Sequence, residues 1–228
     1  MRKTTVRRGI SLLINLIIAV IVAYVWITEA RVSGWMMRDR TGMSSLRTFT
    51  TLSNLFQGLA SALYVASVGY SMIHGRESVP RAVRVVKYAA AVSVTLTFLT
   101  VLLYIGPSRH DMADALFCGN NRYFHFLVPI LAALDQAVFD REGVLRRSDS
   151  LIAATPTVVY GILYWGNIAI NGAGDGAYSN DWYGFLSFGY VFAPVIYGIF
   201  ILIAWGVALL FRLPRRGRKE NKQADHAE

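Results

Sequence analysis

The chain has 228 residues, of which 54% are hydrophobic and only 16% are charged, and its formal net charge is +9. Soluble domains carry about 25% charged residues, so this composition excludes an ordinary soluble globular protein. The basic residues are spread over both termini and alternate loops instead of forming one patch, which argues against a nucleic acid as partner.

Six long apolar stretches follow one another along the chain, and the charged residues lie almost entirely between them. Each stretch is close to the ~20 residues that a helix needs to cross a hydrocarbon core. Because lipid offers the backbone no hydrogen-bond partner, such spans must be helical. The sequence therefore predicts an all-α, polytopic six-transmembrane helix bundle over residues 1–213 and a basic tail over 214–228. The stretches cover residues 10–29, 48–73, 86–106, 123–140, 151–171 and 182–211.

The positions of the 23 Lys and Arg residues predict the orientation of this bundle. Most of them precede the first stretch, follow the sixth, or fall in the segments that would share that side, such as Arg81, Arg84 and Lys87. By the positive-inside rule, both termini lie on the cytoplasmic side (N-in/C-in) of a cell (inner or plasma) membrane. The basic tail is expected to contact anionic headgroups at the inner face. Cys118 is the single cysteine and falls in an outer loop, so no intramolecular disulfide can form.

Polar residues recur on one face of most of these predicted helices. Residues spaced by i, i+4, i+7 and i+11 share a face, and hydrogen bonds between such faces can simply hold helices together. Because the stripes occur on five of the six stretches, they predict a shared polar interior. Their members are Thr50, Asn54, Gln57 and Ser61; Ser93, Thr97, Thr100 and Tyr104; His125 and Gln136; Tyr160, Tyr164, Asn167 and Asn171; and Tyr183, Ser187, Tyr190, Pro194 and Tyr197.

Two of these residues have the chemistry of a nucleophile and a base. Thr50 lies three residues after Arg47. His125 follows Arg122 at the same distance, so both are expected about one turn below the outer surface. A hydroxyl needs an adjacent base to become nucleophilic, and neutral imidazole is the usual one, although a lone histidine near a helix end is more often structural. The side chains expected to line the cavity and donate to an oxyanion are Asn54, Gln57, Trp165, Asn167, Trp182 and Tyr183.

Asp135, which is followed by Gln136, is the only carboxylate deep within a predicted span. An ionisable residue inside a membrane is a functional candidate by default. Asp135 follows His125 by ten residues, about 15 Å along a helix, which is too far for direct contact. It supports an alternative function, a proton-coupled transporter or channel with Asp135 in the pathway.

The segment Phe49-Thr-Thr-Leu-Ser-Asn-Leu-Phe-Gln57 resembles the second-helix motif of the androgen-induced protein family and its bacterial six-helix membrane relatives. The segment from His125 to Asp135, with Pro129 between them, is similar to the family's fourth helix, which carries an acidic residue ten positions after its histidine. Residues 159–165 and 182–186 resemble the aromatic stretches around its fifth and sixth helices. The animal members are threonine hydrolases that cleave fatty acid esters of hydroxy fatty acids.

This resemblance implies that Thr50 is the nucleophile, that His125 is the base, and that the substrate is a membrane lipid or fatty acid ester cleaved without a cofactor. The family's threonine is followed seven residues later by a glutamine, which favours Thr50, with Gln57, over Thr51. Ser53 departs from the family pattern, where an acidic residue stands. No metal is expected, because no second histidine or carboxylate occurs at ligand spacing near the outer cavity. A non-catalytic membrane protein is a further alternative.

Overall fold

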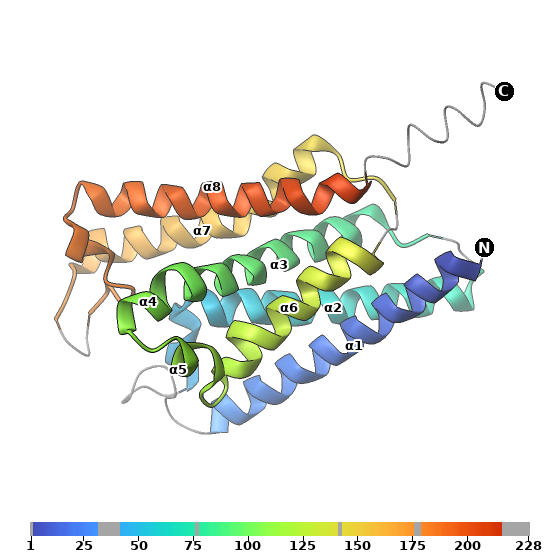
Figure 1. The fold of residues 1–228 in the computed structure, drawn as a ribbon, viewed down its shortest axis with the longest axis horizontal. Coiled ribbons are helices and arrows are strands. Elements are labelled where there is room, and N and C mark those ends of the chain that lie inside the picture. Colours follow the sequence, from blue (N-terminus) through green and yellow to red (C-terminus); the bar gives the residue numbers. More distant parts are fainter. Residues whose placement is uncertain (1, 32–41, 76–77, 141–142, 176–178, 216–228) are drawn as a thin grey trace.

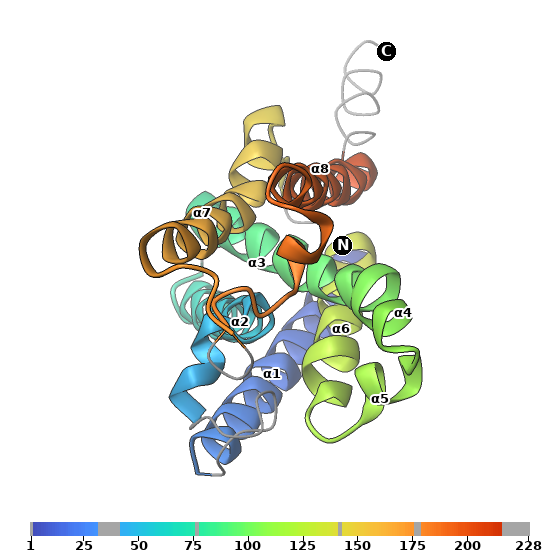
Figure 2. The same ribbon diagram turned by 90° about the vertical axis from the view of Figure 1, so that its left-hand side faces the viewer.

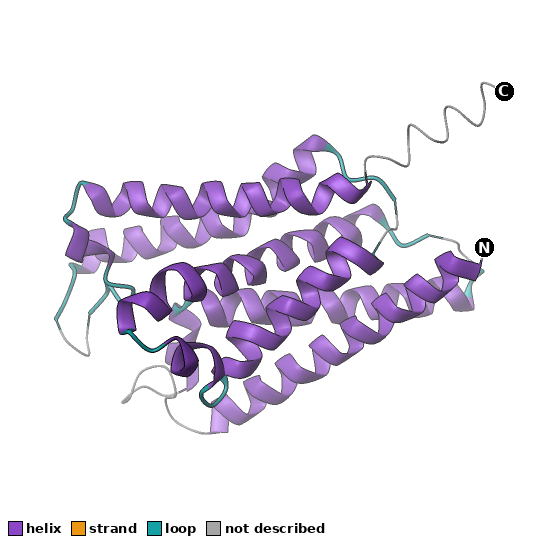
Figure 3. Cartoon of the chain, viewed as in Figure 1, coloured by secondary structure: helices purple, strands orange, loops and turns teal. Residues whose placement is uncertain are grey.

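The computed structural model describes residues 2–31, 42–75, 78–140, 143–175 and 179–215. Every regular element in these ranges is helical, which agrees with the predicted all-α class (Figure 3). Most of the predicted tail, 214–228, lies outside the described residues. The helices are α1 (Arg2–Arg31), α2 (Phe49–Ile73), α3 (Arg81–Thr100), α4 (Gly106–Arg109), α5 (Met112–Phe117), α6 (Val128–Leu134), α7 (Arg147–Asn171) and α8 (Phe192–Arg212).

Wide π-helical turns lengthen two of these helices. The turn Val101–Ile105 joins α3 directly to α4. The turns Arg122–Leu127 and Asp135–Phe139 flank α6, so that one continuous helix, here named the 122–139 helix, runs through all three. His125 lies in the first of these flanking turns and Asp135 begins the second. Such turns occur frequently at functional sites.

The long helices lie side by side, with α3 at the centre of the bundle (Figure 1 and Figure 2). α3 packs against α2, α6, α7 and α8, while α1 covers α2 and α6 on the opposite side from α7 and α8. The largest apolar core joins α1, α3, the 122–139 helix, α7 and α8. α3 is accordingly the most enclosed helix, and its buried face runs almost without interruption from Val83 to Thr97.

Four helical stretches in the described ranges are long and apolar enough to cross a membrane, namely Thr5–Thr28, Arg81–Ser108, Arg147–Asn171 and Phe192–Arg212. Large apolar side chains such as Ile162 and Leu202 are more than 60% exposed on the outer surface of the bundle, where lipid would cover them. These helices indicate a multi-pass membrane protein. α2 and the 122–139 helix are more polar, because each of them contributes buried polar side chains to the interior.

The last long helix begins at Phe192 and not at residue 182, where the apolar pattern predicted its start. Gly184 and Gly189 adopt φ angles of 72° and 88°, a left-handed conformation that favours glycine and ends a helix. The Asp181 carboxylate accepts hydrogen bonds from the backbone amides of Phe185 (2.9 Å) and Leu186 (2.8 Å). Residues 181–189 therefore form a separate folded segment, named here the strap.

Candidate functional site

The first turn of α2 distinguishes the two adjacent threonines of the sequence motif. Thr48 precedes the helix, and its hydroxyl accepts a hydrogen bond from the Thr51 amide (3.3 Å) and donates one to the Thr51 hydroxyl (3.1 Å). Thr51 is thus part of the helix cap. Thr50 is also buried, with 4% of its surface exposed, and its side chain faces a cavity between helices.

This cavity, named here the Thr50 cavity, has a volume of about 40 Å³ and lies where α2, α3, α7, α8 and the strap meet. That volume accommodates a small group such as a carbonyl oxygen or about one or two waters. Among the described residues, twelve line it and seven of these carry a hydroxyl group. The seven are Thr50, Thr97, Thr100, Thr157, Tyr160, Tyr183 and Tyr197.

The strap forms part of the wall of this cavity, through Tyr183 and Phe185, and is fastened to the start of α2. The Tyr183 hydroxyl accepts a hydrogen bond from the Phe49 amide (2.8 Å), one of the amides that has no partner within the helix. The Trp182 indole donates to the Tyr160 hydroxyl (3.0 Å), which in turn donates to the Arg47 carbonyl (2.7 Å). The strap therefore positions Tyr183 directly beside Thr50.

His125 lies on a neighbouring element and is 3% exposed. Its Nδ1 is 2.6 Å from the Ala115 carbonyl oxygen of α5. Because a carbonyl can only accept, Nδ1 carries the hydrogen, and the lone pair of the neutral ring is on Nε2. Asn54 connects this element to α2, since its amide donates both to the Thr50 carbonyl (2.8 Å) and to the Phe124 carbonyl (3.1 Å).

The two residues of the predicted pair lie on adjacent elements. His125 is not among the described residues that line the Thr50 cavity. Apo sites are often looser than the ~2.6–3.2 Å of a productive hydrogen bond, so the dyad stays a prediction.

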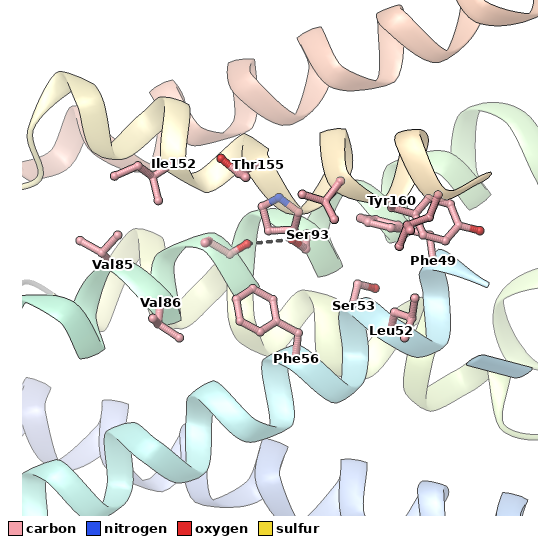
Figure 4. A pocket seen from close by; sticks show the side chains of 14 residues that line it. Phe49, Leu52, Ser53, Phe56, Val85, Val86, Ser93, Ile152, Thr155 and Tyr160 are labelled. Atoms are coloured by element: carbon pink, nitrogen blue, oxygen red, sulfur yellow. Dashed lines mark hydrogen bonds between the residues drawn. The ribbon is translucent and has the colours of Figure 1, made fainter. Parts of the chain in front are cut away.

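A second and larger cavity, of about 460 Å³, lies between α2, α3 and α7 (Figure 4). It shares Phe49 and Tyr160 with the Thr50 cavity. Most of its lining is aliphatic or aromatic, and its Ser93 hydroxyl is bonded to the Ala89 carbonyl (2.9 Å). Leu163 on its rim is 62% exposed. This apolar cavity therefore opens on the surface of the bundle and adjoins the Thr50 cavity.

Most of the six side chains predicted to donate to an oxyanion lie away from the Thr50 cavity. Of the six, Tyr183 is the one that lines the Thr50 cavity among the described residues. Gln57 donates to Ser61 (2.9 Å), farther along α2. Asn167 donates to Asn180 (3.0 Å). The buried indole nitrogen of Trp165 has no hydrogen-bond partner among the described residues.

Asp135 belongs to a separate buried cluster that the sequence analysis did not predict. Its Oδ2 lies 2.6 Å from the Lys87 Nζ atom, which also contacts Asp140 at 3.0 Å, and all three side chains are at most 2% exposed. The Asn15 amide donates to Asp135 (2.7 Å), and the ammonium group lies 3.7 Å from the centre of the Tyr64 ring. These five residues come from α1, α2, α3 and the 122–139 helix with the residue that follows it. We name Asn15, Tyr64, Lys87, Asp135 and Asp140 the Lys87 cluster.

Gln136, the neighbour of Asp135, is 1% exposed. Neither polar atom of its side-chain amide has a hydrogen-bond partner among the described residues. In the predicted topology, Lys87 lies at the inner edge of the third apolar stretch. The ion pair with Lys87 could have been predicted from Asp135, because a carboxylate within a span requires a partner. Lys87 is the cation nearest to the interior of a predicted span.

Comparison with models of protein families, with curated proteins and with solved structures gives no match for this chain.

Proposed function

We propose that this protein is an integral-membrane hydrolase that cleaves lipid (fatty acid) esters near the outer leaflet. Thr50 acts as the nucleophile and His125 as the base. The observation that carries the proposal is the position of Thr50, a buried hydroxyl in a small cavity that adjoins an apolar cavity at the outer surface of the bundle. The apolar cavity suits an acyl chain, and the hydroxyl suits the carbonyl carbon at its end.

The reaction proceeds in two steps. Thr50 Oγ1 attacks the ester carbonyl carbon and its proton passes to His125 Nε2, directly or through one water. The ester C–O bond breaks, and the alcohol leaves with the proton from the imidazolium. Water then attacks the acyl-threonine with His125 again as the base, which releases the fatty acid and regenerates Thr50. The contact between Nδ1 and the Ala115 carbonyl supports this role, because it favours the tautomer with a basic Nε2.

Labelling with a fluorophosphonate tests the nucleophile. The probe is expected to attach to Thr50 of the purified protein in detergent, with loss of fluoride, and to add its mass to the peptide that contains residues 49–57. Thr51→Ala should still be labelled, because the Thr51 hydroxyl belongs to the helix cap. Attachment at another residue, or none to a folded protein, would reject Thr50 as the nucleophile.

A proton-coupled transporter is the second candidate, and the Lys87 cluster is the observation that favours it. Buried ionisable groups inside a membrane protein often mark ion or proton pathways. The cluster already holds its own cation within 2.6 Å of Asp135, so we prefer a structural role for it.

The proposal includes six crossings with both termini in the cytoplasm. α1 begins and α8 ends at the same end of the bundle (Figure 1), which fits an even number of crossings. α2 and the 122–139 helix run alongside the four apolar helices. Their lengths are about 37 and 27 Å at 1.5 Å per residue, close to the ~30 Å of a hydrocarbon core.

Cys118 provides a native reporter for this topology, since it is exposed and lies after α5 at the predicted outer end. A membrane-impermeant maleimide is expected to label it in intact cells. A hydrogen bond to Asp114 raises the pKa of the thiol, so labelling at pH 7 should be slow, should accelerate as the pH rises, and should be faster in Asp114→Asn.

The control for this experiment is Ser148→Cys in a Cys118→Ser background. Ser148 is exposed at the start of α7, the predicted inner end, and its cysteine should react only after permeabilisation. The proposed orientation is wrong if the two sites exchange these behaviours.

A further inference from the structure

Thr157 lines the Thr50 cavity, and its side-chain hydroxyl is buried without a hydrogen-bond partner among the described residues. The residue is 2% exposed. A threonine in a helix can donate to the carbonyl four residues earlier. Thr95 does so to Ala91 (2.7 Å) and Thr155 to Leu151 (3.3 Å). Since buried polar groups are almost always hydrogen-bonded, an unpartnered hydroxyl beside a cavity calls for a ligand.

Three of the other hydroxyl groups around this cavity donate to backbone carbonyls. Tyr160 donates to the Arg47 carbonyl (2.7 Å), Tyr197 to the Thr157 carbonyl (2.7 Å) and Thr97 to the Ser93 carbonyl (3.3 Å). Tyr197 is held there by close packing, because a Cβ atom at Gly161 would lie 2.2 Å from its ring. The Thr157 hydroxyl, which has no hydrogen-bond partner among the described residues, can donate its hydrogen to a group that enters the cavity.

We propose that the Thr157 hydroxyl donates a hydrogen bond to the carbonyl oxygen of the ester as Thr50 attacks it. This inference rests on the proposed function and assigns the oxyanion donor of the same site. Thr50 and Thr157 face one cavity of about 40 Å³ from α2 and α7, so a carbonyl group placed between them meets the attacking oxygen and the donor together. As the carbonyl oxygen gains negative charge, a preoriented donor in a buried cavity stabilises the transition state more strongly than the ground state.

Thr157→Val tests this role because it removes the hydroxyl and keeps the shape of the side chain. Loss of one oxyanion donor lowers kcat by about 10²- to 10³-fold, and KM should change little, since the bond strengthens in the transition state. The melting temperature in detergent should not fall, because no hydrogen bond within the protein is lost. Thr157→Ser should retain most of the activity.

A transition-state analogue separates catalysis from packing. A trifluoromethyl ketone with a fatty acyl chain forms a tetrahedral adduct with a nucleophilic hydroxyl, whereas the matching ether does not. Thr157→Val is expected to weaken binding of the ketone by a factor similar to its loss of kcat, and to leave binding of the ether unchanged. Thr95→Val is the matched control, since Thr95 does not line the cavity, and it should leave both unchanged.

The outcomes distinguish this inference from the proposed function. If Thr50→Ala abolishes hydrolysis while Thr157→Val keeps wild-type kcat and ketone affinity, Thr157 is not the donor and the hydrolase stands. If Thr50→Ala hydrolyses esters as well as the wild type, or the folded wild type hydrolyses none, the proposed function fails and this role falls with it.

Discussion

Thr50→Ala is expected to lower ester hydrolysis by about 10⁴- to 10⁶-fold, the range for loss of a nucleophile from a catalytic unit. The substitution removes the attacking oxygen and disturbs the packing little, since only a hydroxyl and a methyl group are lost. His125→Ala should have a comparable effect, because a hydroxyl is a weak nucleophile without its base. Since the two residues act together, the double variant should be hardly worse than either single one. The measurement is hydrolysis of a fatty acid ester in detergent or liposomes.

Two control variants distinguish a hydrolase from a proton-coupled transporter or channel. Thr51→Ala should retain most activity, because the Thr51 hydroxyl is engaged by Thr48 at the cap. Asp135→Asn should spare fluorophosphonate labelling, because Asp135 belongs to the Lys87 cluster, about 15 Å farther along the helix than His125. A transporter predicts the reverse order, with Asp135 essential and Thr50 nearly silent. Full hydrolysis by a folded Thr50→Ala protein would refute the proposal.

Lys87→Met is expected to destabilise the protein by about 3–5 kcal/mol, because it leaves the buried carboxylate of Asp135 without its ammonium partner. The Asp135 side chain is 2% exposed, so water cannot replace the ammonium group. Combining Lys87→Met with Asp135→Asn should recover most of the loss, since a neutral amide at position 135 needs no counter-charge. Unfolding in mixed detergent, followed by helical circular dichroism, measures the difference.

Arg81→Met is the matched control, since it also removes a cation of α3 from an ion pair. The Arg81 side chain is 45% exposed, and Asp149 still accepts a hydrogen bond from the Arg146 amide (2.7 Å). The loss of Arg81 should therefore cost less stability than the loss of Lys87, because solvent screens the half-exposed guanidinium. Equal stability of the wild type and Lys87→Met would show that the buried cluster does not depend on its lysine.

Much of the fold follows from the sequence, because long apolar stretches fix where helices can lie. The helix α2, for example, was predicted over residues 48–73 and runs from Phe49 to Ile73. The late start of α8 was also readable, since Gly184 and Gly189 are turn signals inside an apolar run. The preference for Thr50 over Thr51 came from the motif, and the cap at Thr48 gives it a physical reason.

Other features depend on tertiary packing and have no local signal. The helical wheel that aligned His125 with Gln136 assumes 3.6 residues per turn, whereas His125 lies in a π-helical turn and Asp135 begins another. Lys87 was counted as a flanking charge, and only the convergence of α1, α2 and the 122–139 helix reveals that it is enclosed. Thr157 belongs to none of the polar stripes predicted from the sequence. What distinguishes it is that its hydroxyl has no hydrogen-bond partner among the described residues, which only the structure can show.

The Lys87 cluster also bears on how the chain enters the membrane during synthesis. Lys87 and Asp135 lie on different helices, and a charge that enters lipid without its partner carries an insertion cost, which reaches about 2.5–3.5 kcal/mol at the centre of a helix. Lys87 leaves the ribosome before Asp135, so α3 is expected to stay at the exit of the translocon until its partner arrives. The 122–139 helix, which is short and carries Asp135, gains its counter-charge only by entering beside α3. The two helices are therefore expected to be released into lipid as a pair rather than one after the other.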